Sequence, residues 1–271
     1  MQKPVIAPVI AIDRGASFTD FAVVQDEQFI DHTSIETRSW KDILVALSRV
    51  QNKHKTDQLV FTGAASQMPA KIQKQIVEIP EIEAIGLGGA TLAKYETCLV
   101  VSMGTGTAMV HFDKNKVSHV GGTGVGGGTI KGLAALICNI DDPAVLEKQA
   151  LSGKATHLNM TIGDLGLDDL SFLPADATVG NFANIKSDRI EDKAAAILSL
   201  VAETIGIIAS LCARAINCQD RIVAVGKVST NQHIRHTLER VGSLYQTRFI
   251  YPEHPECATA FGAAIRHLKD P

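Results

Sequence analysis

The chain has 271 residues, of which 45% are hydrophobic and 20% charged, and its formal net charge at pH 7 is −3. This composition predicts a globular protein with enough apolar material for a core, built as one large domain or as two lobes that share a cleft. Acidic and basic residues are mixed without a basic block, which argues against nucleic acid as a partner.

The first third of the chain predicts an antiparallel meander followed by alternating helices and strands. Apolar, β-branched runs between turn residues indicate the strands, and apolar residues at helical spacing indicate the helices. We expect strands over 5–12, 18–24, 29–36 and 59–63, a helix over 40–50 with Ser39 as its N-cap, and a helix over 81–94.

The same order of elements begins again at residue 98. Residues 153–187, rich in Asp, Gly and Pro, show no readable period. Few charges interrupt the 190–217 segment, so we expect a helix there that is buried in the core or in an interface. The other elements expected are strands over 98–102, 108–112, 117–121, 221–226 and 248–251, and helices over 129–139, 231–245 and 257–268.

A strand–turn–strand unit therefore occurs twice, at 5–24 and at 98–112. This duplication predicts an α/β protein of the actin-like, ribonuclease H-like fold, in which two lobes face each other across a nucleotide cleft. We expect the N-terminal lobe to span residues 1–96 and the C-terminal lobe residues 97–271.

The five cysteines and the chain start indicate the compartment. The cysteines show neither a CxxC pair nor metal-ligand spacing, so we expect buried free thiols. The first residues lack the apolar run of a secretory signal, and we expect no stretch of the ~20 apolar residues that span a bilayer. We therefore predict a cytoplasmic protein that has no membrane partner.

The turn of the first unit places a carboxylate beside exposed backbone N–H groups. Asp13 ends the first strand, and Gly15, Ala16 and Ser17 form the turn that follows. A carboxylate at this position suits Mg²⁺, and the N–H groups of a tight turn suit phosphate oxygens. A surface β-turn that uses Asp and Gly without any ligand is the alternative.

Two glycine-rich segments follow in the second unit. The turn 103–107 alternates glycine with threonine, and an ordinary hairpin turn is its alternative. Six of the eight residues 121–128 are glycine, and they lead into a helix, whose N-terminus collects free N–H groups and the positive end of the dipole. We therefore predict an anion site there rather than a flexible linker. No Gly-Lys-Ser/Thr closes the segment, so it is not a Walker A loop.

Two further positions complete the candidate site. Glu81 and Glu83 begin a helix on different sides, so they do not form a carboxylate pair, but one of them is a candidate general base. An acidic, solvated helix start is the alternative. Gly226 ends a strand and precedes a helix, which suits close approach to a nucleotide or to another backbone.

Taken in order, these motifs resemble those of the type II pantothenate kinases over nearly the whole chain. That family combines an Asp-bearing first turn, an acidic helix, a glycine–hydroxyl hairpin, a triglycine helix start and a small-residue final helix. The matching pieces are Asp13-Arg-Gly-Ala-Ser17, Phe61-Thr-Gly63, Glu81-Ile-Glu-Ala84, Met103-Gly-Thr-Gly-Thr107, the run from His119 to Leu133, and Ala258-Thr-Ala-Phe-Gly-Ala263.

The resemblance implies ATP- and Mg²⁺-dependent phosphorylation of the hydroxyl of pantothenate to 4'-phosphopantothenate, the first step of coenzyme A biosynthesis. It implies that Asp13 lies near Mg²⁺ and the γ-phosphate, that Glu81 is the general base, and that a homodimer forms through the 190–217 helix. The implied nucleotide-binding residues are Gly15, Ala16, Ser17, Gly104, Gly124, Gly126, Gly127, Gly128 and Gly226, and the implied substrate-binding residues are Thr105, His119 and Gly121.

Three positions depart from the family pattern. The family usually has Lys where this chain has Asp20 and Arg where it has His119, and its first loop reads Gly-Gly-Thr where this chain has Gly-Ala-Ser. Removing one transition-state donor lowers a rate by ~10²–10³. Two alternatives therefore stay open: a degenerate kinase that binds nucleotide as a regulator, and a kinase for another hydroxy-acid or sugar-like substrate. Phe18-Thr-Asp20 adds a third, an ATP-dependent amide-ring hydrolase that resembles the hydantoinase/oxoprolinase group.

Overall fold

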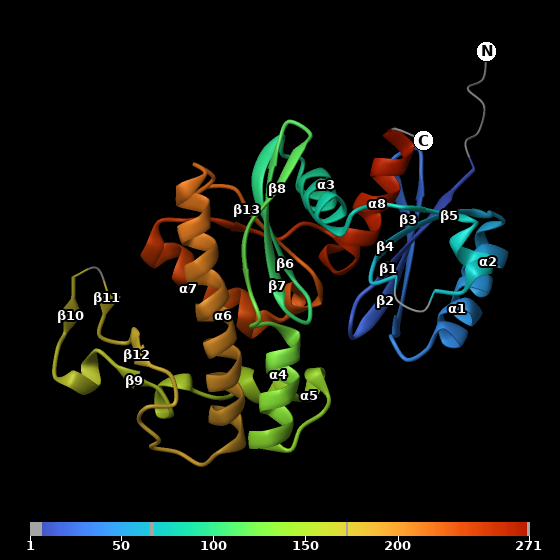
Figure 1. Cartoon of the computed structure of the whole chain (residues 1–271). Coiled ribbons are helices and arrows are strands. Elements are labelled where there is room, and N and C mark those ends of the chain that lie inside the picture. Colours follow the sequence, from blue (N-terminus) through green and yellow to red (C-terminus); the bar gives the residue numbers. More distant parts are fainter. Residues whose placement is uncertain (1–6, 66–67, 172, 270–271) are drawn as a thin grey trace.

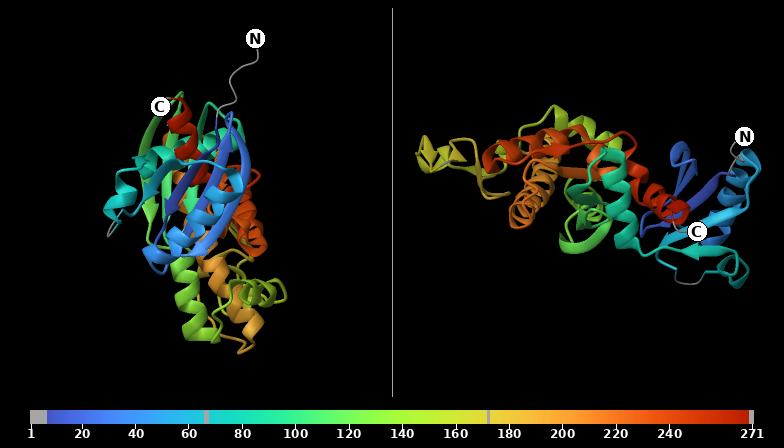
Figure 2. Two further views of the ribbon diagram at one scale, coloured as in Figure 1. Left: turned by 90° about the vertical axis from the view of Figure 1, so that its right-hand side faces the viewer. Right: turned by 90° about the horizontal axis from the view of Figure 1, so that it is seen from above.

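The computed structural model describes residues 7–65, 68–171 and 173–269. Two five-stranded mixed sheets lie side by side, and the helices α3 (Glu81–Ala93) and α8 (Ala258–Lys269) pack between them (Figure 1). The segment around 155–180 projects from the end of the molecule that lies farthest from the first sheet (Figure 2).

The first sheet is a three-stranded antiparallel meander extended by two parallel strands. Its order is β3-β2-β1-β4-β5, in which β1 pairs antiparallel with β2 and parallel with β4. Both faces of β1 are covered, which is why its apolar run is continuous rather than alternating. The strands are β1 (Val9–Arg14), β2 (Phe18–Gln25), β3 (Gln28–Glu36), β4 (Gln58–Gly63) and β5 (Ile76–Glu78).

The second sheet repeats this topology strand for strand. Its order is β14-β13-β6-β7-β8, again an antiparallel meander with two parallel strands at one side. The duplication predicted from the two strand–turn–strand units is therefore present in the sheets. The strands are β6 (Thr97–Met103), β7 (Thr107–Asp113), β8 (Lys116–Thr123), β13 (Ile222–Val225) and β14 (Phe249–Ile250).

Helices cover the outer faces of the two sheets. On the first sheet, α1 (Trp40–His54) begins as predicted at Ser39, whose hydroxyl accepts a hydrogen bond from the Asp42 backbone N–H. On the second sheet, α6 (Ile190–Ala215) lies between α7 (Gln232–Tyr245) and α5 (Pro143–Leu151) and supplies much of the core.

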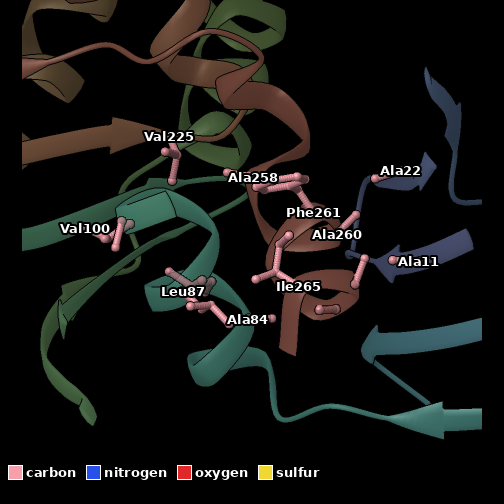
Figure 3. Close-up of a cluster of buried hydrophobic side chains, with 14 of the residues drawn as sticks. Ala11, Ala22, Ala84, Leu87, Val100, Val225, Ala258, Ala260, Phe261 and Ile265 are labelled. Atoms are coloured by element: carbon pink, nitrogen blue, oxygen red, sulfur yellow. The ribbon is translucent and has the colours of Figure 1, made fainter. Parts of the chain in front are cut away.

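The layer between the sheets is a continuous core to which both lobes contribute. Figure 3 shows Ala11 and Ala22 of the first sheet and Val100 and Val225 of the second, with side chains of α3 and α8 between them. The two helices cross backbone to backbone. A Cβ added to Gly88 would lie 1.9 Å from the carbonyl oxygen of Ala258. Close packing therefore explains the glycine in a helix that glycine otherwise weakens. The predicted boundary at 96–97 stays a prediction.

Several elements differ from the sequence prediction. The helix expected over 129–139 begins earlier as α4 (Gly127–Leu133) and continues as a π-helical turn, Ala134–Cys138. The first strand begins at Val9, and residues 5–6 of its predicted range lie outside the described residues. The elements without a prediction are α2 (Ala70–Gln73), β5, α5, β9 (Met160–Thr161), β10 (Asp169–Leu170), β11 (Leu173–Pro174), β12 (Thr178–Gly180) and the 3₁₀ turns Ala155–His157, Gly163–Leu165, Lys227–Thr230 and Pro255–Cys257.

Among the described helices, α6 is long and apolar enough to cross a membrane by length and composition alone, so the expectation that no stretch has that length is wrong. In the fold, 61% of its apolar window is buried, as the core prediction requires. All five cysteines are free thiols; four are buried and Cys212 is half-buried.

Candidate active site

The first hairpin places two carboxylates side by side, and one of them contacts the second lobe. Asp13, near the end of β1, lies opposite Asp20 on β2 and opposite Thr62 on β4. Directly opposed residues share one face of a sheet, so the three side chains point the same way. The hydroxyl of Thr62 is buried and has no hydrogen-bond partner among the described residues. A buried hydroxyl without a partner beside a carboxylate suits a hydrated cation, because both groups offer oxygen ligands.

The surroundings of Asp13 favour its neutral form in the free protein. Burial, first, and then the charges of Asp20 and Glu81 raise the pKa of Asp13 to about 8, whereas Lys227 lowers it. A carboxyl group with so high a pKa gains from a bound cation, which favours its ionised form. The residues present therefore fit Mg²⁺ at Asp13.

The two hairpin tips meet across the lobes. The hydroxyls of Ser17, in the β1–β2 turn, and Thr105, in the β6–β7 turn, form a hydrogen bond of 2.9 Å. Both residues are exposed to solvent. The structure thus brings together predicted site residues from opposite lobes, as a nucleotide cleft requires.

The glycine-rich segment packs on the second hairpin. The backbone N–H groups of Gly127 and Gly128 donate to the carbonyl oxygens of Gly104 and Thr105 at 2.8 and 2.9 Å. A Cβ on Gly126 would lie 2.7 Å from the Thr105 carbonyl oxygen. Close approach to the hairpin accounts for these glycines, and their N–H groups must be released before they can hold phosphate. That role stays a prediction.

The fold requires glycine at Gly226 but not at Gly124. No atom lies within 4 Å of a Cβ added to Gly124, so nothing in the fold requires glycine there. Gly226 has φ +88°, and a Cβ there would lie 2.5 Å from the carbonyl oxygen of Met103. Gly226 therefore fixes the turn that joins β13 to the 3₁₀ turn Lys227–Thr230.

The turn after Gly226 sends a lysine into the first lobe. Lys227 Nζ donates to Asp20 Oδ1 and Oδ2 at 2.7 and 2.6 Å, and His32 Nε2 lies 3.0 Å from Oδ1. Burial alone raises the pKa of Asp20, but the hydrogen bond from His32 and the charge of Lys227 outweigh burial and hold that pKa below its usual range. Asp20 is therefore an ionised carboxylate whose partners are His32 and Ser34 of the first sheet and Lys227 of the second lobe.

Glu81 and Glu83 have separate surroundings at the start of α3. Glu81 is exposed, and its charge contributes to the raised pKa of Asp13. Glu83 instead faces Arg266 of α8, with 3.5 Å between Oε2 and Nε. Glu81 is thus the glutamate on the side of the first hairpin, as a general base at the cleft requires.

The predicted substrate residues of β8 lie on opposite faces of the second sheet. His119 lies opposite Val110, which faces α3. Gly121 faces α6, where a Cβ would lie 3.0 Å from Cys212 Sγ. Packing against α6 explains this glycine, and the roles of both residues at a substrate stay predictions.

Two other features of the described residues lie beside this site. His32, Glu256 and Cys257 offer three metal-ligand atoms within 4.8 Å of one another, although His32 already bonds Asp20. A hollow of about 410 Å³ lies between α3, the β7–β8 hairpin and the end of α8, and Glu83 is the one candidate site residue among those that line it. Its lining residues are Glu83, Leu87, Phe112, Asn115, Val117, Arg266 and Lys269.

Sequence reasoning missed Thr62, His32 and Lys227. Thr62 belongs to the matching piece Phe61-Thr-Gly63 but was given no role, and His32 lies inside an ordinary strand pattern without a local signal. Lys227 follows a glycine at the end of a strand, a context typical of ligand-facing turns, and that signal was available.

Comparison with known proteins identifies similar chains. The model of the Fumble family matches residues 89–265. A type II pantothenate kinase of Bacillus cereus (strain G9842) is 24% identical over 278 residues, covering 96% of this chain and 98% of the relative. A type II pantothenate kinase of Oceanobacillus iheyensis is 27% identical over 256 residues, covering 89% and 91%.

Solved structures resemble this chain over nearly its whole length. The activator of the 2-hydroxyisocaproyl-CoA dehydratase from Clostridium difficile with bound ADPNP matches with TM-score 0.69 and 18% identity, covering 97% of this chain and 95% of that one. A ROK family glucokinase from Streptomyces griseus in complex with glucose and AMPPNP matches with TM-score 0.65 and 12% identity, covering 96% and 98%. These similarities confirm the predicted actin-like fold.

Proposed function

The chain belongs to the Fumble family, the family of the type II pantothenate kinases, and from that premise we propose that it transfers the γ-phosphoryl group of ATP to the hydroxyl of pantothenate. The observation that carries the proposal is the meeting of the two hairpin tips at Ser17 and Thr105. Asp13 lies near the end of β1, the strand that leads into the turn with Ser17. Phosphoryl transfer needs positioning and charge neutralisation more than covalent chemistry, and an arrangement of this kind supplies both.

The residues of the cleft divide the task. Glu81, exposed near Asp13, accepts the proton of the attacking hydroxyl. Asp13, with Thr62 beside it, would hold Mg²⁺, which when bound would neutralise charge on the transferred phosphate. Hydroxyls and N–H groups at the tips of the two turns hold the phosphates from both lobes.

The experiment is an assay of purified protein with Mg-ATP and pantothenate, with phosphopantothenate measured by mass spectrometry. Glu81→Gln should lower kcat by about 10²–10⁴-fold, the usual contribution of a positioned general base. Glu83→Gln is the matched control, because Glu83 pairs with Arg266 on the other side of the helix. Absence of product from the wild type would refute pantothenate as substrate.

The same protein separates the alternatives. Calorimetry with ADP detects nucleotide binding whether or not turnover occurs, so binding without turnover on a panel of hydroxy-acids and sugars favours a regulatory protein. Turnover on another member of that panel identifies a kinase with a different substrate.

The remaining parts of the proposal concern assembly and location. We place the protein in the cytoplasm, as its free thiols suggest, and infer a homodimer through the exposed edge of α6, where Leu211 is 53% exposed. Leu211→Glu should convert the dimer to a monomer in light scattering, and a wild-type monomer contradicts this inference.

A further inference from the structure

We propose that Lys227 binds a phosphate group of the nucleotide and that Asp20 is a positioning residue that holds the lysine in place. The proposal rests on the proposed function only in that it requires a nucleotide in the cleft. It assigns a role to the ion pair that joins the two lobes.

The pair is made by residues 207 positions apart in the sequence. Both carboxylate oxygens of Asp20 accept hydrogen bonds from Lys227 Nζ, at 2.7 and 2.6 Å. A lysine ammonium has three N–H donors, and two of them are used here, so one donor is left for an anion. The Lys227 side chain is 32% exposed whereas that of Asp20 is 10% exposed, so the lysine is the more accessible partner of the pair.

The ammonium lies among the parts of the predicted phosphate site. Its nitrogen is 4.3 Å from the centre of the Phe18 ring, and Phe18 directly follows Ser17, whose hydroxyl reaches the second hairpin. Its charge also acts on Asp13, the candidate Mg²⁺ ligand. On the other side, Val228 packs against the glycine-rich segment, where a Cβ on Gly127 would lie 3.2 Å from its Cγ2. Lys227 therefore stands on a turn that borders both hairpins and the glycine segment.

Asp20 has its own supports, which make it suited to positioning. His32 contacts the same carboxylate, and the other ring nitrogen of His32 lies 4.0 Å from Glu256 of the second lobe. A carboxylate alone near phosphates would repel them, but one that holds an ammonium leaves no net negative charge at this point. Arg14, a cation of the first hairpin itself, donates to the carbonyl oxygen of Ala64 and lies over Trp40. Lys227 instead directs its ammonium to Asp20 and to the Phe18 ring, beside the tip of the first hairpin.

The test compares ligands that differ only in phosphate number. Calorimetry with AMPPNP, AMP and adenosine is carried out in Mg²⁺ on wild type and Lys227→Met. We expect AMPPNP binding to weaken by about 10–100-fold and adenosine binding by less than twofold, because one charge-assisted hydrogen bond is lost. Lys227→Arg should retain most of the affinity for AMPPNP.

Two further variants exclude indirect effects. Lys53→Met breaks a lysine–aspartate pair inside the first lobe, Lys53 Nζ to Asp31 Oδ2 at 2.6 Å, and should leave all three affinities unchanged. The double variant Asp20→Asn with Lys227→Gln removes both charges and leaves a neutral amide pair. It should still lose about tenfold in AMPPNP affinity, and it also serves if Lys227→Met does not fold.

If the double variant binds AMPPNP as tightly as the wild type, the proposal is overturned. The loss in Lys227→Met would then come from repulsion of phosphate by the unpaired Asp20 and not from a missing contact with Lys227. An equal loss for adenosine and AMPPNP also overturns the proposal, because the pair then only joins the lobes. The outcome is separable from the proposed function. A phosphate-specific loss without pantothenate turnover supports Lys227 alone, turnover with unchanged binding in the variants supports the kinase alone, and absence of nucleotide binding refutes both.

Discussion

The two lobes have the same backbone topology but different chemistry at equivalent positions. Thr62 lies opposite Asp13 in the first sheet, and Val225 lies opposite Ser102 in the second, so Asp13 and Ser102 correspond. Across the hairpins, Asp20 corresponds to Ala108. At these two pairs of equivalent positions, only the first lobe has carboxylates.

The glycines that end β4 and β13 show how far the backbones agree. Gly63 has φ +89° and Gly226 has φ +88°, and a Cβ on either would lie within 2.6 Å of a carbonyl oxygen of the neighbouring strand. The residues that follow them differ, because Ala64 follows the first glycine and Lys227 the second. Duplication thus supplies two like turns, and the site arises because unlike side chains on those turns face each other.

The largest effect is expected from removing the carboxylate of Asp13, which the second lobe lacks. Asp13→Asn should lower kcat by about 10²–10³-fold, because a cation ligand at the transferred phosphate is lost. Ser102→Ala, at the equivalent position of the second lobe, should change kcat by no more than a few fold. Steady-state kinetics with circular dichroism as a check on folding measures both, and comparable losses at the two positions contradict a division of labour between the lobes.

The next effect tests the agreement of the backbones. Gly63→Ala and Gly226→Ala should each lower the free energy of unfolding by roughly 1–3 kcal/mol, since both place a Cβ at positive φ against a carbonyl oxygen. Gly124→Ala is the control and should stay within about 0.5 kcal/mol, because its Cβ meets no atom. Urea unfolding gives the three values; a marked difference between Gly63→Ala and Gly226→Ala shows that the turns are not equivalent.

A pH titration examines the charge of the first hairpin without nucleotide or Mg²⁺. The pKa of Asp13 is raised to about 8 in the folded protein, above the 3.8 of an unperturbed aspartate. Between about pH 4 and pH 8 the unfolded chain therefore binds fewer protons at this residue, so its contribution to stability is fully present below pH 4 and is lost as pH rises through 8.

Asp13→Asn lacks this loss. The melting temperature of Asp13→Asn, relative to that of the wild type, should rise by a few degrees between pH 5 and pH 8 and level off above pH 8. This corresponds to about 1–2 kcal/mol in the free energy of unfolding, after allowance for the partial exposure of Asp13. Differential scanning calorimetry gives the difference at each pH, and a constant difference means that Asp13 is ionised throughout.

The smallest effect concerns the contact between the two tips. Ser17→Ala and Thr105→Val, singly and together, form a double-mutant cycle for the 2.9 Å hydrogen bond. The coupling in the free energy of unfolding should be about 0.5–1.5 kcal/mol, which is the net value of a neutral hydrogen bond. It should be smaller if water competes for the hydroxyls at this exposed position. Zero coupling means that the tips do not hold each other in the free protein.

The sequence predicts the sheets well because their signals are local. The continuous apolar runs that end in Asp13 and Ser102 mark strands covered on both faces, and the glycine–hydroxyl turns mark the hairpins. The long apolar helix at 190–217 is also recovered as α6, which ends two residues earlier. Such elements follow from the spacing of apolar residues alone.

The site is less predictable because its partners are distant in the chain. The glycines at 126–128 indicate close approach, but only the structure shows that they approach the second hairpin. From the sequence, Asp20 indicates only that the family's lysine is missing at this position. The structure shows that Lys227 of the opposite lobe supplies a cation beside it. The irregular 153–187 segment has short elements without a repeated pattern, which no spacing rule predicts.

The crossing of α3 and α8 has a consequence for motion. At Gly88 and Gly262 the two backbones touch without side chains between them, and a Cβ on Gly262 would lie 2.0 Å from the carbonyl oxygen of Ala84. Because no side chains interlock there, the helices are able to rotate about the contact, whereas sliding would drive a carbonyl into the next turn. We therefore expect the molecule to open by a change of angle about this pivot, and Gly262→Ala to reduce the spread of interlobe distances measured by paired spin labels.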